Sequence, residues 1–432
     1  MARSDADARP ALDRARLKPR VAVLVTGSEL IRGSRRDSNG PFLAEELTRL
    51  GLEPSSIRIV GDDAAELEPA IRAELGADLL VLSGGLGPTH DDRTVELLAR
   101  AAGLETSVAP ELEQEIEGVS RRIAERLGRP YAEFEEGVRK QASVPTGGRV
   151  IGIAGTAPGL VVETGGAVAV VLPGPPPELR RLWQAALEDE AVRNLLERAE
   201  APERRVLRVY GIGESAVAQA LAEAGGEPEG VQATICAHAG EIWVELFGEG
   251  EELAESFRSA LGAAIFSEDD RPVEELVLEM ARESGFSLGA AESCTGGLVA
   301  ARLTSVPGSS DVFRGGVVAY DNEVKHAQLG VSEETLAAHG AVSAETASAM
   351  ALGARESLGV DVAVSVTGIA GPGGGTPEKP VGLVFLSASG RGAELARELN
   401  LPGDREAVRR RATAAALHLL RELLTQISNS SA

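Results

Sequence analysis

From residue 20 onward, the chain repeats one order of features: a short apolar run, a glycine-rich turn and an amphipathic stretch. Compact apolar runs are typical of strands buried on both faces of a sheet, and the first four lie at residues 21–25, 57–60, 78–83 and 168–173. Between the first two, a stretch from Pro41 to Gly51 has the start and stop signals of a helix. Alternating strands and helices favour a mostly parallel sheet. We therefore predict a three-layer α/β domain over residues 20–185.

The pattern changes after residue 185. We predict a small α+β middle domain over residues 186–270, because strand-like runs at 204–211, 231–237 and 241–248 alternate with two helical stretches, from about Ser215 and over 250–264. The pair Ala239-Gly240 is suited to a hairpin turn between the last two strands. No residue of this middle domain has a pattern that indicates catalysis.

The α/β alternation returns over residues 271–432, where four apolar runs alternate with helical stretches and the last helix covers about 404–426. The predicted fold class is therefore α/β, with two three-layer α/β domains with mostly parallel sheets, joined by the small α+β domain. Residues 1–19 carry mixed charges and no apolar run, so we predict a disordered extension there.

Charge and composition exclude several classes of function. The chain has 432 residues and a net charge of −23, which disfavours direct binding to nucleic acid or to an anionic membrane. No apolar run approaches the roughly 20 residues that span a bilayer. The two cysteines, Cys236 and Cys294, lie far apart in the sequence and do not form a disulfide framework. We therefore predict a cytoplasmic protein without a membrane or nucleic-acid partner.

Four unusual turns accompany the apolar runs of the first domain: TGSEL at 26–30, SGGLGPTHDDRT at 83–94, GTAPG at 155–159 and PGPPPE at 173–178. Because the carboxyl ends of parallel strands share one edge of a sheet, we expect these turns to converge on a ligand. Gly84, Gly85 and Gly87 would let main-chain N–H groups approach an anion. Asp91 and Asp92 could hold a magnesium-type ion that neutralises a diphosphate. The alternative is that the glycines only form tight turns and the aspartates only cap a helix.

Together with KQA at 140–142, these motifs resemble the amino-terminal half of the competence/damage-inducible CinA family, whose fold is similar to molybdopterin-binding domains. The resemblance implies a metal-dependent pyrophosphatase that acts on ADP-ribose. It assigns metal or phosphate binding to Glu29, Asp91 and Asp92, and substrate binding to Gly84, Gly85, Gly87, Thr89, Lys140, Thr156 and Glu178. One departure is Ile151-Gly152-Ile153, where the family pattern is Pro-Asn-Pro, so a polar contact is expected to be missing.

Two glycine-rich segments of the last domain follow apolar runs. In ESCTGGLVAARLTSVPGSS, residues 292–310, a strand, a glycine turn and a helix follow one another, which is the order that presents N–H groups to a phosphate. The alternative is an ordinary helix capped by serine or threonine. In TGIAGPGGG, residues 367–375, so many glycines indicate close approach of the main chain to a ligand.

The chain uses only four lysines among 43 basic residues, and one of them, Lys325, lies between these two segments. A buried lysine loses its proton more readily, so Lys325 could accept the hydroxyl proton of Ser309 or Ser310. No Ser-His-Asp pattern is present, and Cys294 is more typical of a small buried residue than of a nucleophile. Lys379 is either a second phosphate contact or a residue that covers the site.

The motifs AESCTGG, VPGSS, GGVVAYDNEVK, HGAVS, VTGIAGPGGGTPEKPVG and GDREAVR resemble the CinA carboxyl-terminal domain, which is similar to stand-alone nicotinamide mononucleotide deamidases. The resemblance implies a cofactor-free reaction with Ser310 as the nucleophile and Lys325 as its base. Tyr320 and Thr367 would line the nicotinamide pocket. The implied substrate-binding residues are Ser293, Thr295, Gly296, Gly297, Gly368, Gly371 and Arg405.

The sequence thus predicts a hydrolase with two activities on small-molecule nucleotides. One half would deamidate nicotinamide mononucleotide, and the other would hydrolyse ADP-ribose with a divalent metal ion. The resemblance also implies a homo-oligomer, with a dimer favoured. Two alternatives stay open: a non-enzymatic nucleotide- or pterin-binding regulatory protein linked to competence or DNA damage, and a protein in which only the carboxyl-terminal half is active.

Overall fold

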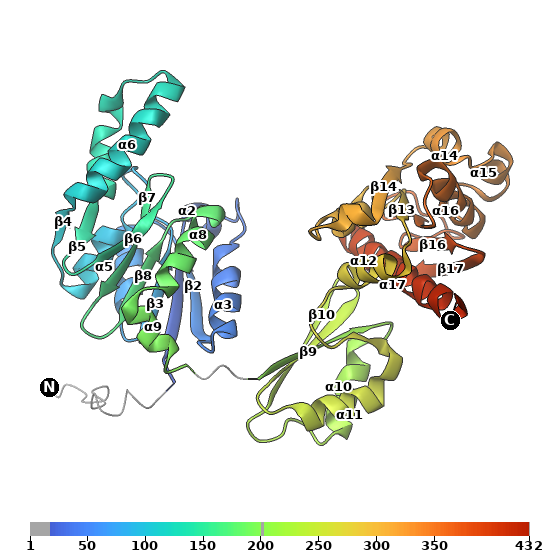
Figure 1. The fold of residues 1–432 in the computed structure, drawn as a ribbon, viewed down its shortest axis with the longest axis horizontal. Helices are drawn as coiled ribbons and strands as arrows, with labels where there is room; N and C mark the ends of the chain where they lie inside the picture. The colour runs from blue at the N-terminus through green and yellow to red at the C-terminus, as the bar shows by residue number, and fades with distance from the viewer. Residues whose placement is uncertain (1–17, 200–202, 432) are drawn as a thin grey trace. The chain divides into compact units, whose positions relative to one another are not determined.

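The computed structural model describes residues 18–199 and 203–431. The chain divides into two compact units, residues 1–202 and 203–432 (Figure 1). The extension predicted for residues 1–19 lies outside the described residues, except for its last two positions.

A six-stranded mixed sheet forms the centre of the first unit, in the order β2-β1-β3-β8-β7-β6. The first four of these strands are parallel, whereas β7 and β6 form an antiparallel hairpin at one edge. The four predicted runs correspond to β1 (Val21–Thr26), β2 (Pro54–Val60), β3 (Leu79–Ser83) and β8 (Val168–Leu172), and the hairpin strands are β6 (Arg149–Ala154) and β7 (Ala157–Glu163). A separate two-stranded sheet pairs β4 (Thr106–Val108) with β5 (Ser143–Pro145).

Helices cover both faces of this sheet, because alternate residues of each strand point to opposite sides. In β1, Val21, Val23 and Val25 pack against one set of helices, whereas Ala22 and Leu24 pack against the other. The first set is α3 (Asn39–Arg49), α8 (Pro176–Leu187) and α9 (Glu190–Leu196), and the second is α4 (Ala64–Glu74), α5 (Thr94–Ala102), α6 (Pro110–Leu127) and α7 (Glu135–Gln141). Two short helices, α2 (Ser28–Ile31) and η1 (Tyr131–Glu133), complete the unit.

The first unit extends beyond the predicted boundary at residue 185, which falls inside α8. Val192 and Leu195 of α9 are buried in the same core cluster as Trp183, so this helix belongs to the first unit. The sequence could not place the boundary here because α9 follows α8 after only two residues and has no apolar run of its own.

The second unit begins with an antiparallel sheet in the order β10-β11-β9-β12. The elements are β9 (Arg204–Tyr210), α10 (Glu214–Glu223), β10 (Gln232–His238), β11 (Glu241–Phe247), α11 (Glu251–Leu261), η2 (Gly262–Ala264) and β12 (Ile265–Ser267). Ala239 and Gly240 both have positive φ, 52° and 95°, and join β10 to β11 as predicted. The edge strand β12 is an addition to the predicted β-α-β-β-α order.

A second α/β sheet follows in the order β14-β13-β15-β16-β17. Strands β14, β13 and β15 are parallel, and β16 and β17 add antiparallel pairs. The strands are β13 (Leu288–Glu292), β14 (Phe313–Val318), β15 (Val362–Gly368), β16 (Leu383–Gly390) and β17 (Ala393–Asn400). Their helices are α12 (Val273–Ser284), α13 (Leu298–Thr304), η3 (Ser309–Asp311), α14 (Asn322–Leu329), α15 (Glu333–His339), α16 (Ala344–Leu358) and α17 (Arg405–Ser431).

Both faces of this sheet are also covered. Side chains of α12, α13 and α17 pack on one face, and side chains of α14 and α16 pack on the other. The predicted α/β class with three-layer domains is therefore confirmed, and both large sheets are mixed, with parallel centres and antiparallel edges.

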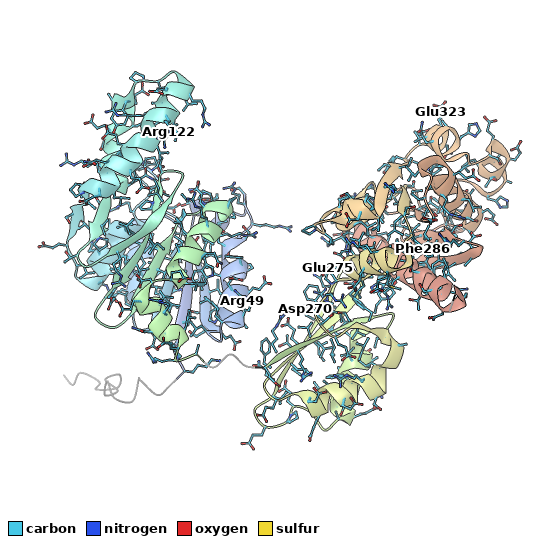
Figure 2. The ribbon with its side chains drawn as sticks, in the orientation of Figure 1. Arg49, Arg122, Asp270, Glu275, Phe286 and Glu323 are labelled. Atoms are coloured by element: carbon cyan, nitrogen blue, oxygen red, sulfur yellow. The ribbon has the colours of Figure 1, made fainter. Side chains whose placement is uncertain are left out.

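The small sheet contacts α17 through buried polar groups. Nε2 of His418 lies 2.9 Å from Oε1 of Glu241, and the His418 ring stacks on Tyr210 with 3.6 Å between ring centroids. Asp270, labelled in Figure 2, accepts hydrogen bonds from Arg204 and Arg208 just before α12 begins. Within residues 18–199 and 203–431, no helix is both long enough and apolar enough to cross a membrane.

Candidate functional sites

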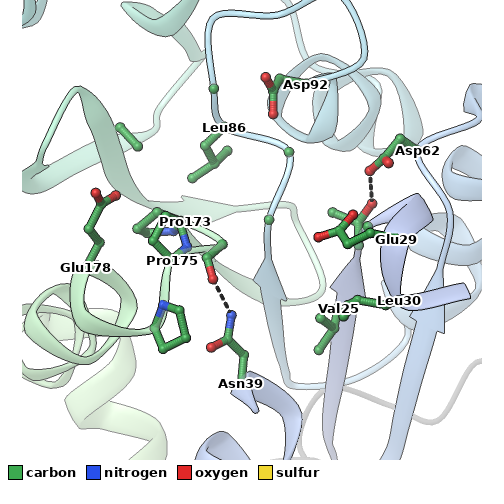
Figure 3. A pocket seen from close by; sticks show the side chains of 18 of the residues that line it. Val25, Glu29, Leu30, Asn39, Asp62, Leu86, Asp92, Pro173, Pro175 and Glu178 are labelled. Atoms are coloured by element: carbon green, nitrogen blue, oxygen red, sulfur yellow. Dashed lines mark hydrogen bonds between the residues drawn. The ribbon is translucent and has the colours of Figure 1, made fainter. Parts of the chain in front are cut away.

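A cavity of about 510 Å³ lies at the carboxyl ends of β1, β3 and β8 (Figure 3). All four turns that the sequence singled out contribute to its wall, because the antiparallel strand β7 begins at the edge where its parallel neighbours end. Of the predicted residues, the lining includes Glu29, Gly84, Gly85, Gly87, Asp91, Asp92, Thr156 and Glu178. The turns therefore converge as the strand-end argument requires.

The glycines of the β3–α5 loop are required by local packing as well as by the cavity. Gly84 and Gly85 have φ of 106° and 67°, which side chains rarely adopt. A Cβ atom on Gly84 would lie 2.5 Å from the Thr26 carbonyl oxygen, and one on Gly87 would collide with the Asp92 carboxylate. The alternative that these glycines form tight turns therefore explains part of the reason why glycine occurs at these positions.

Asp91 and Asp92 follow these glycines and gather around Thr89. The Thr89 N–H donates to Oδ2 of Asp92 at 3.0 Å, and its hydroxyl contacts both carboxylates. The hydrogen bond from Thr89 lowers the pKa of Asp91 below its usual range. Lys140 donates to the Thr89 carbonyl and lines a smaller neighbouring cavity. The loop is thus anionic and lies beside one lysine.

The three predicted metal ligands do not form one close cluster. No group of three His, Cys, Asp or Glu side chains suited to a metal ion occurs in the described part of the chain, and Glu29 belongs to the α2 wall whereas Asp91 and Asp92 belong to the β3–α5 loop. Magnesium is commonly held by one or two carboxylates together with substrate phosphates and water. The Asp91–Asp92 pair fits an ion that is held jointly with a phosphate ligand.

Several cavity residues were missed at the sequence level. Asp62 accepts hydrogen bonds from the Thr26 hydroxyl at 2.9 Å and from the Ser28 N–H at 2.7 Å. It lies two residues after the end of β2, so the strand-end rule could have found it. Asn39 is 6% exposed, and its side-chain amide donates to Ser83 Oγ and to the Gly174 carbonyl. Figure 3 shows Asn39 below the proline-rich turn that it binds.

The Ile151-Gly152-Ile153 departure lies in the edge strand β6. Ile151 packs against the core on the α8 side, and Ile153 packs against the core on the opposite side. Neither isoleucine is among the described residues that line the cavity. Glu178, in the first turn of α8, lies over Gly155, and burial raises the pKa of its carboxyl group. Gly152 is not among the described lining residues either, so the Ile151-Gly152-Ile153 segment contributes no polar group to the cavity.

In the second unit, Lys325 is 1% exposed on α14. Its Nζ donates to the carbonyl oxygens of Ala319 at 2.9 Å and Tyr320 at 3.4 Å. Burial lowers the pKa of Lys325, although the Asp321 carboxylate opposes the shift. A neutral lysine amine has two N–H bonds and one lone pair. Because the two carbonyls take the two N–H bonds, the lone pair stays available to accept a proton.

Ser310 is exposed in η3, before β14, whereas its neighbour Ser309 is buried. In the described part of the chain, no hydrogen bond joins Ser310 to Lys325. The amine of Lys325 donates instead to the two main-chain carbonyls. Ser310 precedes the amino end of β14, whereas the carbonyls that hold Lys325 follow its carboxyl end, so the two residues lie at opposite ends of this strand and are not brought together.

The turn before α13 does not offer its N–H groups to a phosphate, contrary to our expectation for Gly296 and Gly297. The carboxylate of Glu292, which is 1% exposed, accepts hydrogen bonds from the N–H groups of Gly297, Val299 and Ala300 at 2.8–3.1 Å. A buried internal carboxylate thus occupies the positive end of this helix. The alternative predicted from the sequence was a serine or threonine cap, but the residue that caps α13 is a glutamate six positions before its first residue, Leu298.

Two arginines of α17 connect the predicted segments. Arg405 donates to the Gly371 carbonyl at 2.7 Å and to the Tyr320 hydroxyl at 2.8 Å. Arg409 donates to the carbonyls of Cys294 and Thr295. The sequence predicted Arg405 as a substrate-binding residue but did not predict Arg409. Arg409 lies one helical turn after Arg405 on the same face of α17. The ring of Tyr320 remains 60% exposed.

The remaining predicted residues are mostly buried. The Thr367 hydroxyl donates to the Ala341 carbonyl at 2.6 Å, so it is already engaged. Thr295 is fully buried and its hydroxyl has no partner in the described part of the chain, whereas Ser293 is 9% exposed. A Cβ atom on Gly368 would lie 2.7 Å from the Leu383 carbonyl oxygen, so this glycine is required by strand packing. The glycine-rich run therefore has a structural cause at this position.

Cys294 and Lys379 also have definite positions. Cys294 is 5% exposed, and burial raises the pKa of its thiol to about 11, so the thiol is protonated at neutral pH. This agrees with a buried structural role. The Lys379 ammonium donates to the carbonyls of His339 and Val342 at 2.8 and 2.6 Å, which fastens its loop to the segment after α15.

The chain is a multidomain α/β protein, and its first unit is similar to molybdopterin-binding domains by its match to a family model. The family model described as "Probable molybdopterin binding domain" matches residues 22–193, and the model described as "CinA C-terminal domain" matches residues 270–424. The first match also extends beyond residue 185, in agreement with the position of α9.

Relatives match along nearly the whole chain. A CinA-like protein of Mycolicibacterium paratuberculosis is 42% identical, with 94% of this chain and 98% of the relative covered. A CinA-like protein of Mycobacterium tuberculosis is also 42% identical, with 95% and 99% covered. The solved structure of competence/damage-inducible protein CihA from Agrobacterium tumefaciens is 44% identical and covers 35% of this chain and 95% of its own, with a TM-score of 0.34. The chain belongs to the CinA family, which confirms the resemblance.

Proposed function

We propose that the carboxyl-terminal α/β domain hydrolyses the carboxamide of nicotinamide mononucleotide to nicotinate mononucleotide and ammonia. The observation that carries this proposal is the buried amine of Lys325, whose two N–H bonds are taken by main-chain carbonyls and whose pKa is lowered by burial. Arginine could supply the same charge but could not give up its proton, so a lysine in this position supports a base.

In the proposed reaction, Ser310 Oγ attacks the carboxamide carbon, and the Lys325 amine accepts the hydroxyl proton. Lys325 then donates this proton to the departing ammonia, and water hydrolyses the acyl-enzyme to the acid. Main-chain N–H groups of the 368–375 loop would stabilise the oxyanion. Because the two side chains lie at opposite ends of β14 and no hydrogen bond joins them, the reaction requires a rearrangement that brings Ser310 within reach of Lys325 when substrate binds.

Substrate recognition is assigned to the charged ends of the nucleotide. Arg405 lies on α17 beside Tyr320 and is a candidate for the 5′-phosphate. The positive charge of the pyridinium ring makes the carbonyl carbon more electrophilic, and the phosphate supplies binding energy remote from the reacting bond. Free nicotinamide should therefore be a poor substrate.

The test is to incubate the full chain with nicotinamide mononucleotide and to measure ammonia and nicotinate mononucleotide. We expect equal amounts of the two products, and at least about a thousandfold loss of rate in Ser310→Ala. The conservative neighbour change Ser305→Ala, in the turn after α13, is the matched control. Unchanged turnover in Ser310→Ala would exclude this serine as the nucleophile.

We propose a second activity, the hydrolysis of ADP-ribose to AMP and ribose 5-phosphate, for the first unit. The convergence of four turns on one cavity favours it. Asp91 and Asp92 would hold a magnesium-type ion, which neutralises the diphosphate when bound. Loss of AMP formation in Asp92→Asn, compared with an unchanged rate in Asp63→Asn at the α4 N-terminus, would support this assignment. Equal rates would contradict it.

The alternative functions make different predictions. A regulatory protein that binds nucleotides or pterins would be stabilised against heat by its ligands but would not convert them. If only the carboxyl-terminal half were active, ammonia would be released without AMP. We further propose that the protein is a cytoplasmic homodimer that acts on small-molecule nucleotides, and light scattering would measure its assembly.

A further inference from the structure

The cavity of the first unit is strongly acidic. Six carboxylate side chains line it, and among the described lining residues the only cationic side chains are Arg35 and Arg36. At contact distances, like charges repel by about 1–4 kcal/mol, depending on the solvent exposure of the pair. A ligand with a diphosphate therefore needs cations from the protein in addition to any metal ion. The six carboxylates belong to Glu29, Asp37, Asp62, Asp91, Asp92 and Glu178.

The two arginines lie on a loop that is fastened at both ends. On one side, the N–H groups of Ser34 and Arg35 donate to the Glu29 carbonyl at 3.0 and 3.2 Å. On the other side, Oδ1 of Asp37 accepts the N–H of Asn39 at 2.9 Å, next to the start of α3. The main chain around Arg35 and Arg36 is therefore fixed, while their side chains are exposed at the cavity.

Neither guanidinium is used in the fold. In residues 18–199 and 203–431, no carboxylate lies within ion-pair distance of Arg35 or Arg36. This differs from arginines elsewhere in the same unit, such as Arg149, which binds Asp189 at 2.8 Å. Unpaired guanidinium groups beside six carboxylates are available to a ligand that carries its own negative charge. Arginine is also suited to phosphate, because its planar fork can donate two parallel hydrogen bonds.

We propose that Arg35 and Arg36 form the diphosphate-binding part of this cavity. They would bind phosphate oxygens independently of the metal ion that the Asp91–Asp92 pair would hold. This inference deepens the proposed ADP-ribose hydrolysis and rests on it for the identity of the whole ligand. The chemistry recognised is a diphosphate ester, so inorganic pyrophosphate serves as the smallest probe.

The chain offers a matched control. Arg32 lies three residues before Arg35, is also exposed, and does not line the cavity. Replacement of any of the three by glutamine removes one positive charge and no hydrogen bond of the fold. Changes in stability are therefore expected to be small for all three variants. A difference in ligand affinity between them then shows whether the replaced arginine lies at the cavity.

The experiment measures binding of pyrophosphate, ADP-ribose and adenosine to the full chain by calorimetry, at low ionic strength and with a metal chelator. The proteins are the wild type, Arg35→Gln/Arg36→Gln and Arg32→Gln. Because two charge-assisted phosphate contacts are lost, we expect the double variant to bind pyrophosphate and ADP-ribose at least about tenfold more weakly. Arg32→Gln should change both affinities by less than about twofold, and adenosine binding should be equal in all three proteins.

Equal pyrophosphate affinity in the double variant and in Arg32→Gln would overturn the inference, whether or not the wild type hydrolyses ADP-ribose. Failure of the wild type to bind pyrophosphate would overturn it as well. Arginine-dependent binding of pyrophosphate without ADP-ribose hydrolysis would leave the inference intact and contradict only the proposed activity. Failure of the inference about the two arginines can thus be told apart from failure of the proposed ADP-ribose hydrolysis.

Discussion

At the residue scale, the central feature is a lysine that is as inaccessible to solvent as the residues of the apolar core. Lys325 is 1% exposed, and its amine is held by two carbonyls rather than by a carboxylate. An ion pair would have kept the ammonium charged, whereas carbonyls at the end of β14 leave burial as the main influence on its pKa. The residue is therefore better suited to proton transfer than to structural charge.

This environment predicts the pH dependence of deamidation. The rate should rise with pH as Lys325 loses its proton and should level off below about pH 10.4, the ordinary pKa of lysine. Between the pKa of Lys325 in the folded chain and its higher pKa in the unfolded chain, the unfolded chain binds more protons. The free energy of unfolding therefore also rises with pH over this range. Initial rates of ammonia release between pH 6 and 10 would measure the effect. A flat profile would contradict the role of Lys325.

Residues on loops were predicted with mixed success. The strand-end rule found Asp91, Asp92 and Glu178, because they stand in unusual turns directly after apolar runs. The same rule applied to β2 would have found Asp62. Arg35 and Arg36 carry no such signal, since exposed arginines are common in this sequence. Only the folded position of their loop connects them to the cavity.

At the element scale, strands β1, β3 and β8, which are buried on both faces, were predictable. The edge strand β2 was predicted too, but its Ile57 and Ile59 are exposed rather than buried on both faces as expected. The edge strands β6 and β17 were not predicted. The sequence of β17, AELARELN, consists of residues that favour helices, and its alternating exposure becomes visible only beside β16. The hairpin strand β6 is similar, because a register shift between Val150 and Gly152 interrupts its pattern. In both cases a tertiary partner, rather than local preference, determines the structure.

The start of α13 gives an element-scale prediction. Glu292 is buried and accepts three main-chain N–H groups, so Glu292→Ala would leave these donors without a partner. We expect a loss of about 2–4 kcal/mol in the free energy of unfolding, and a smaller loss of about 1–2 kcal/mol in Glu292→Gln, which keeps one acceptor. Urea unfolding would measure both.

The control for this comparison is Glu323→Gln on the exposed side of α14, labelled in Figure 2, for which a change within about 0.5 kcal/mol is expected. If Glu292→Ala were as stable as this control, the carboxylate would not be the cap of α13. The helix end would then be open to a phosphate after all.

At the scale of the whole molecule, the second unit joins the small sheet to the carboxyl-terminal domain through a buried polar contact. His418 binds Glu241 and lies between Tyr210 and Phe266, with Arg302 3.8 Å from the same carboxylate. Burial lowers the pKa of His418, despite the attraction of Glu241. A neutral ring that donates from Nε2 explains why Nδ1 has no partner.

This contact predicts acid sensitivity of the second unit. The folded-state pKa of His418 lies below that of an unfolded histidine, about 6.5. The neutral His418 therefore contributes fully to the free energy of unfolding above about pH 6.5, and this contribution is lost as the pH falls below that value. The slope is at most about 1.4 kcal/mol per pH unit. In His418→Gln, which keeps a donor to Glu241 without titrating, this slope should disappear.

Urea unfolding between pH 5 and 8, followed by hydrogen–deuterium exchange in peptides from β11 and α17 so that only the second unit is measured, would give this slope, with the exposed His339→Gln as the control. An identical pH dependence in His418→Gln and wild type would show that another group causes the sensitivity. No sequence pattern indicated this contact, because His418 and Glu241 are 177 positions apart, one on helix α17 and the other on strand β11.

The central claim is that Lys325 acts as a base, and the most direct measurement is ammonia release from nicotinamide mononucleotide by the full chain with Lys325→Arg. Arginine keeps the positive charge and cannot accept a proton near neutral pH. We predict a loss of at least about a thousandfold in kcat, with binding of the nucleotide retained. If Lys325→Arg kept most of the wild-type rate, the lysine would supply only charge, and the proposed mechanism would be wrong.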